Sequence, residues 1–145
     1  MSFINNIQTR FKQANIVEKF ISINLTIFLL TFVLNTIGFL FQSNSNLIID
    51  WFILPATFHE FLFKPWTILS YGFVHVEFLH ILMNLIGLYF VGNLFIQYFT
   101  PKQFISFYIL GTLFGGLIFM LSYNFFPAFS SDVSNSVLLG ASAGV

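Results

Sequence analysis

Apolar residues occur in long uninterrupted runs in this chain, and short polar segments separate the runs. The first run covers residues 20–41, close to the roughly 20 residues that a helix needs to cross a hydrocarbon core about 30 Å thick. Two further runs cover residues 78–99 and 104–126, and a fourth begins at Val137 and reaches Val145. The pattern predicts three complete membrane-spanning helices and the start of a fourth.

The connections between these runs predict the rest of the architecture. Residues 42–77 carry Trp51 and Trp66 among charged residues, which suits the membrane interface. We expect this outer loop to contain short helices or to dip into the membrane against protein. The short segment 100–103 predicts an antiparallel pair of helices on either side of it. Within the N-terminal segment 1–19, the apolar spacing over residues 3–17 predicts an amphipathic helix on the cytoplasmic interface.

The fourth run is too short to span a membrane. A helix that ended at Val145, about two turns after Val137, would leave its last carbonyls unpaired in hydrocarbon. We therefore expect the chain to be the N-terminal part of a longer protein, truncated within the fourth helix. On this interpretation residues 20–145 form an incomplete membrane domain.

Composition and charge support the same class. The chain is 57% hydrophobic and 7% charged, whereas soluble domains carry about 25% charged residues. Five basic residues balance five acidic ones, which leaves no basic patch for a nucleic acid.

The orientation of the chain in the membrane follows from its basic residues, because basic loops favour the cytoplasmic side. We expect a multi-pass protein of a bacterial inner (cytoplasmic) membrane with a cytoplasmic N-terminus, because Arg10, Lys12, Lys19 and Lys102 fall on one side and Lys64 on the other.

Three polar side chains stand inside the predicted spans, where they cost free energy unless they serve a function. His80 and Asn84 are four residues apart and share one helix face. With the N-terminus inside, the second and fourth helices both begin at the outer face. At a rise of about 1.5 Å per residue, Ser142 then reaches a similar depth. A hydroxyl facing two hydrogen-bond donors has the parts needed for acyl transfer, apart from a base.

The order of these residues resembles the rhomboid family of intramembrane serine proteases, over about residues 60–145. The segment from His80 to Asn84 is similar to the H-x-x-x-N motif of that family, and His75 precedes it at the usual spacing. Gly140-Ala141-Ser142 is similar to the G-x-S nucleophile motif. The resemblance implies an all-α polytopic membrane protein with a rhomboid-like helical bundle. It also implies a serine endopeptidase that cleaves membrane-anchored substrates near the outer face.

The resemblance also implies the role of each site residue. Ser142 is the nucleophile, while His80 and Asn84 help the Ser142 backbone N–H to bind the oxyanion. The general base of the family is a histidine on the sixth span, which lies beyond this chain. Because a positioned base contributes about 10²–10⁴-fold, we expect the chain alone to be inactive.

Two positions depart from the family pattern. Trp66 supports the resemblance of the outer loop to that of the family. The residue after Trp66 is Thr67, where the family often has arginine, so any anchoring of the loop by that arginine is absent or moved. Ala143 precedes Gly144 where the family often has glycine directly after the serine. The second change keeps the position small.

Other interpretations of the same residues stay open. His80 and Asn84 could be an interhelical hydrogen-bonded pair, and Gly140-x-x-x-Gly144 could be a helix-packing motif. Gly111-x-x-x-Gly115 in the third span is more simply explained by packing. An inactive rhomboid-like protein that binds transmembrane segments is the alternative function. A transporter or channel subunit with a polar site at the midplane is a more distant one.

A metal site has little support in the sequence. His59 with Glu60, and His75 with Glu77, form pairs, but zinc needs three or four ligands. We expect no metal and no cofactor. The expected partners are transmembrane protein substrates and the lipid bilayer, and the pattern leaves the oligomeric state open.

Overall fold

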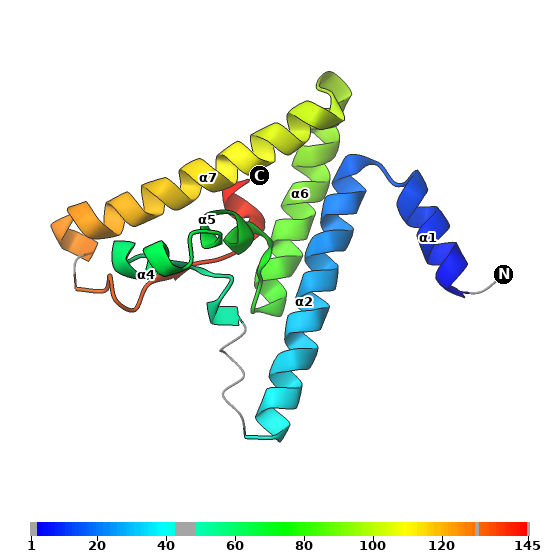
Figure 1. Cartoon of the computed structure of the whole chain (residues 1–145). Coiled ribbons are helices and arrows are strands. Elements are labelled where there is room, and N and C mark those ends of the chain that lie inside the picture. The colour runs from blue at the N-terminus through cyan, green and yellow to red at the C-terminus, as the bar shows by residue number, and fades with distance from the viewer. Residues whose placement is uncertain (1–2, 43–48, 130, 145) are drawn as a thin grey trace.

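The computed structural model describes residues 3–42, 49–129 and 131–144 (Figure 1). Its main elements are three long helices, α2 (Ile16–Leu40), α6 (Phe78–Tyr98) and α7 (Pro101–Phe125). Each is long and apolar enough to cross a membrane, so the described residues confirm the expected all-α fold with three complete spans. The other elements described in the chain are α1 (Phe3–Gln13), β1 (Leu54–Pro55), α4 (Phe58–Phe63), α5 (Thr67–Ser70), η1 (Tyr71–Phe73), η2 (Pro127–Phe129), β2 (Val137–Leu138) and η3 (Ala141–Ala143).

Side-chain caps set where two of the long helices begin. The Asn15 side chain accepts a hydrogen bond from the Glu18 amide at 2.9 Å, and the Glu18 carboxylate accepts one from the Asn15 amide. Thr100 and Gln103 form the same reciprocal box at α7, where Pro101 occupies the first turn. Such caps satisfy amides that a helix start leaves unpaired. The predicted helix over residues 3–17 is therefore interrupted, because Asn15 starts α2 as a separate helix.

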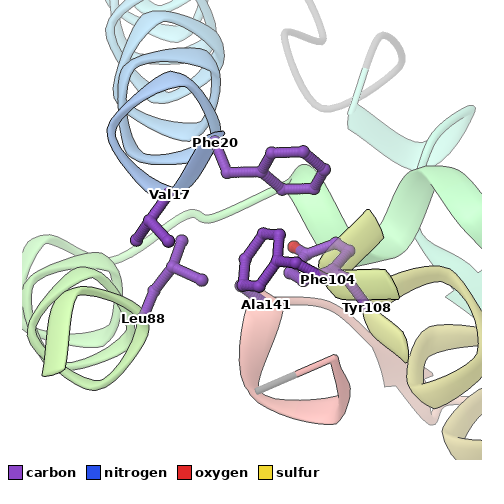
Figure 2. Close-up of a cluster of buried hydrophobic side chains, with 6 residues drawn as sticks. All are labelled: Val17, Phe20, Leu88, Phe104, Tyr108 and Ala141. Atoms are coloured by element: carbon purple, nitrogen blue, oxygen red, sulfur yellow. The ribbon is translucent and has the colours of Figure 1, made fainter. Parts of the chain in front are cut away.

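The three long helices form an open frame. Figure 1 shows α2 and α6 side by side, whereas α7 leaves the end of α6 and diverges from it. The angle between α6 and α7 holds α5 and the C-terminal turn (Figure 1). Figure 2 shows the buried cluster at this junction, formed by Val17, Phe20, Leu88, Phe104, Tyr108 and Ala141. The core therefore includes the turn beside Ser142 as well as all three helices.

The connection between α2 and α6 contains short helices, as expected, and buried tyrosines fix it to α7. The Tyr71 hydroxyl donates a hydrogen bond to the Thr112 carbonyl at 2.7 Å. In the opposite direction, the Tyr108 hydroxyl donates to the Gly72 carbonyl at 2.8 Å. Both tyrosines are completely buried. The η1 turn therefore has a fixed position on α7.

The prediction that a helix begins at Val137 is wrong. Val137 and Leu138 form β2, which pairs antiparallel with β1 in the register Leu54 to Leu138 and Pro55 to Val137. After this strand the chain bends at Gly140 and enters η3. A short apolar run suits a strand as well as a helix start, and the loop strand that pairs with it is distant in the sequence.

We expect Tyr71→Phe to lower the free energy of unfolding by about 1–2 kcal/mol, because a buried hydroxyl loses its hydrogen bond to Thr112. Thermal unfolding in detergent micelles measures the change. Tyr89→Phe is the matched control, since Tyr89 is exposed on α6. Equal melting temperatures for the two variants would contradict the proposed anchoring of η1.

Candidate functional site

The centre of the site is His75, which lies just before α6 and is completely buried. Its Nε2 atom lies 3.0 Å from Asn84 Nδ2. The backbone N–H of Ala141 donates to the same nitrogen at 3.2 Å. The ring of His80 lies close to that of His75, with 5.3 Å between the centroids. One imidazole therefore contacts both the polar residues of α6 and the turn that carries Ser142.

The backbone N–H of Ala141 determines which nitrogen of the His75 ring carries the proton. An amide N–H can only donate, so the Nε2 atom of His75 must carry a lone pair. The neutral ring then has its proton on Nδ1. The Asn84 atom that faces Nε2 must also be a donor, which makes it the amide nitrogen and not the oxygen. Asn84 keeps a second N–H for another acceptor.

Burial keeps this imidazole neutral. The pKa of His75 is lowered from 6.5 to about 4, chiefly by burial and further by the neighbouring His80. An interaction with the carbonyl of Phe73 raises the pKa, but by less. His75 is therefore an uncharged acceptor at neutral pH.

Gly140 allows the turn to approach the α6 residues. Its backbone has φ 105° and ψ 156°, a conformation that is essentially restricted to glycine. A Cβ atom there would lie 2.7 Å from His80 Nε2 and 3.2 Å from Asn84 Nδ2. The Gly140 amide donates to the Tyr71 carbonyl at 2.9 Å. The absence of a side chain thus allows contact with α6, and the loop fixes the backbone.

Two glycines of α7 allow close packing against the other side of the η3 turn. A Cβ atom at Gly111 would lie 2.6 Å from the Ala143 carbonyl oxygen, and one at Gly115 would lie 2.7 Å from Ala143 Cβ. The expected packing role of Gly111-x-x-x-Gly115 agrees with these contacts, and in the described part its partner is the η3 turn. Gly140 and Gly144 flank this turn, which leaves Gly140-x-x-x-Gly144 outside a regular helix.

Ser142 lies in the middle of η3, and its side chain is exposed. Since consecutive Cα atoms are about 3.8 Å apart, its Cα lies within about 7.6 Å of the Gly140 Cα. The hydroxyl makes no hydrogen bond with the described residues. Ser142 is therefore beside the cluster of His75, His80 and Asn84, with an accessible oxygen.

Trp66 lies apart from this cluster. Its indole N–H donates to the Trp51 carbonyl at 2.7 Å, and the two rings stack with centroids 5.8 Å apart. Lys64 donates to the Asp50 carbonyl at 3.0 Å and lies over the Trp51 ring. A lysine two positions before Trp66 thus anchors the loop backbone, in a chain with no arginine after the tryptophan.

The sequence pattern predicts His80, Asn84 and Gly140 as site residues, and the structure brings them together. It indicates His75 only through its spacing, whereas in the structure His75 joins the other groups. The available signal was its place at the start of an apolar span, because a buried neutral imidazole there must find donors or acceptors.

The described residues contain no group of three or more histidine, cysteine, aspartate or glutamate side chains that could hold a metal ion. The donors and acceptors that the hydrogen bonds above place at the site are amides and imidazoles, with the Ser142 hydroxyl beside them. Such groups suit stabilisation of a developing oxyanion.

Comparisons with known proteins agree with the motifs. The family model of the Rhomboid domain matches residues 62–145. The chain is similar to the RHOMBOID-like protein 12, mitochondrial, of Arabidopsis thaliana, with 31% identity over 87 residues. That match covers 54% of this chain and 26% of the relative, so the chain spans about a quarter of the relative's length. No solved structure matches.

We expect Gly140→Ala to lower the free energy of unfolding by about 1–3 kcal/mol, because the backbone conformation is strained for alanine. The new methyl group would also press against His80 Nε2. Thermal unfolding in micelles measures the loss. An unchanged melting temperature would show that the turn does not adopt this conformation beside α6.

We also expect the fold to lose stability in acid. The pKa of His75 is about 4 in the fold, against 6.5 for an unperturbed histidine, so the unfolded chain binds more protons between these values. The contribution of neutral His75 to the free energy of unfolding is fully present above pH 6.5. It falls as the pH drops towards 4, by up to about 3 kcal/mol. Melting temperatures between pH 7.5 and pH 4 test this expectation. His75→Gln should flatten the curve, and an equal slope in this variant would assign the effect to another group.

Proposed function

Because the chain belongs to the rhomboid family, we propose that the full-length protein is an intramembrane serine endopeptidase that cleaves membrane-anchored protein substrates. The chain is part of a multi-pass integral membrane protein. The observation that supports the proposal is that His80 and Asn84 contact one buried imidazole, and that the turn carrying Ser142 contacts the same imidazole through the Ala141 amide. Family membership alone would fit a protein without activity equally well.

In the proposed reaction the Ser142 oxygen attacks the scissile carbonyl carbon, and a tetrahedral intermediate forms. The carbonyl oxygen gains negative charge and accepts hydrogen bonds from the Ser142 amide, His80 and Asn84. Removing one such donor from a protease typically costs about 10²–10³-fold in kcat. Asn84 suits this role, since its Nδ2 atom has one N–H left after binding His75.

The proton of Ser142 needs a separate base. His75 does not suit this task, because its Nε2 lone pair already accepts two hydrogen bonds. His80 is assigned to the oxyanion. The proposal therefore takes the base from a histidine on a later helix, as the family resemblance implies. That histidine takes the serine proton, gives it to the leaving amine and then activates the water that hydrolyses the acyl-enzyme ester.

The proposed setting is a bacterial inner membrane, with the N-terminus in the cytoplasm and cleavage near the outer face. The support is the distribution of basic residues, which favours the cytoplasmic side. Arg10, Lys12 and Lys19 lie in or before the first turns of α2, and Lys102 lies at the α6–α7 turn. The candidate site is at the opposite end of α6. Water from the outer face would reach it by a short route.

We expect Ser142→Ala in the full-length protein to abolish cleavage of a transmembrane reporter substrate and labelling by a fluorophosphonate. Its membrane insertion and melting temperature should stay close to those of the wild type, since the side chain is exposed. Ser134→Ala is the matched control, because Ser134 is exposed in the preceding loop.

The outcomes separate the protease from the alternative. Cleavage by Ser142→Ala at the wild-type rate would remove Ser142 as the nucleophile. A wild-type protein that binds the reporter but neither cleaves it nor reacts with the label would be an inactive binder of transmembrane segments.

A further inference from the structure

We propose that His75 is a positioning residue, whose Nε2 lone pair holds the Ala141 amide and the Asn84 carboxamide in register for catalysis. This inference rests on the proposed function. Its structural part concerns two hydrogen bonds to one nitrogen, at 3.0 Å and 3.2 Å.

The two donors lie on elements that are distant in the sequence. Asn84 lies in the second turn of α6, whereas Ala141 is the first residue of η3. Convergence on a single atom fixes the distance between the proposed oxyanion donor and the turn that carries the nucleophile. Precise placement of this kind matters, since a shift of about 1 Å can cost about 10²-fold in rate.

The bond to His75 also selects the orientation of Asn84. A carboxamide can rotate so that either its oxygen or its nitrogen faces a given point. Since the unprotonated Nε2 accepts only donors, His75 draws the nitrogen of Asn84 towards itself. The second N–H of that nitrogen then has a defined direction, which a freely rotating side chain would lack.

The backbone of the turn is held by two successive amides. The Gly140 amide donates to the Tyr71 carbonyl, and the Ala141 amide donates to His75. The next amide in the chain is that of Ser142, which the proposed reaction assigns to the oxyanion. His75 therefore acts on two of the proposed donors, through Asn84 directly and through the Ala141 backbone.

The support for His75 is rigid. Its side chain is completely buried, and the η1 turn before it is tied to α7 through Tyr71 and Tyr108. Burial of a polar group is costly unless it is hydrogen-bonded. Nε2 has both donors, whereas Nδ1 is buried without a hydrogen-bond partner among the described residues, so the two bonds to Nε2 are the ones that hold the ring. A nonpolar residue could fill the same space without holding either donor.

The first test measures the protonation of His75 in the full-length wild-type protein. Nitrogen NMR of histidine labelled with ¹⁵N distinguishes a protonated from an unprotonated Nε2. We expect His75 to have an unprotonated Nε2 and a protonated Nδ1 at pH 7. A proton on Nε2 would overturn the proposal, since that nitrogen could not accept from Ala141 or Asn84.

The second test compares His75→Gln with His75→Asn. The glutamine oxygen reaches the place of Nε2 and can accept both hydrogen bonds, whereas the shorter asparagine cannot reach it. We expect His75→Gln to keep at least about a third of the wild-type kcat. His75→Asn should lower kcat by about 10–100-fold, less than about 10²–10³-fold for a lost oxyanion donor, with KM within about twofold.

A double-mutant cycle with Asn84→Ala separates positioning from a general loss of structure. If His75 acts through Asn84, the cost of Asn84→Ala in kcat should shrink in the His75→Asn background. Equal costs in both backgrounds, or a folded His75→Asn protein with wild-type kcat, would overturn the proposal. If His75→Asn does not fold, the ¹⁵N NMR spectrum of the wild-type protein tests the proposal instead, through the protonation of His75.

The same experiments distinguish failure of the proposed function. In that case the wild-type protein neither cleaves the reporter nor reacts with a fluorophosphonate. The protonation of His75 is measured independently of activity, so it still shows whether this residue holds the two donors.

Discussion

The arrangement of the site depends on one buried, uncharged imidazole. His75 can accept hydrogen bonds from Asn84 and Ala141 only while its Nε2 atom lacks a proton. Burial beside His80 favours that neutral form. The same low polarity that makes a buried charge unfavourable therefore maintains the acceptor that holds the turn against α6.

The surrounding fold makes this contact possible by allowing close approach on both sides of the turn. Gly140 leaves room for His80 and Asn84, and Gly111 and Gly115 leave room for Ala143. Pairing of β1 with β2 brings the chain from the C-terminal end of α7 back to the start of α6. The exposed serine is thus placed by backbone contacts of its neighbours, and its own side chain remains accessible.

Local sequence patterns predicted the parts of the fold that depend on local physics. The apolar runs identify α2, α6 and α7, because crossing a membrane requires length and hydrophobicity alone. The spacing of His80 and Asn84 places them on one helix face, because residues four apart are neighbours on the surface of a helix. The capping boxes at Asn15 and Thr100, which the sequence analysis does not predict, explain why α2 and α7 begin before the apolar runs do.

The remaining features depend on partners that are distant in the chain. Val137 and Leu138 form a strand only because Leu54 and Pro55 offer a backbone edge. The importance of His75 comes from the Ala141 amide, 66 positions away. No pattern around His75 indicates that contact, so the sequence predicts the motif but not the role of His75 as its central acceptor.

The most direct measurement is the scalar coupling across the hydrogen bond between the Ala141 amide nitrogen and the Nε2 nitrogen of His75. The account predicts a resolved coupling between these two nitrogens in the folded full-length protein at neutral pH. It also predicts that the coupling disappears when His75 is protonated. A His75 Nε2 atom without coupling to Ala141 at neutral pH would contradict the account.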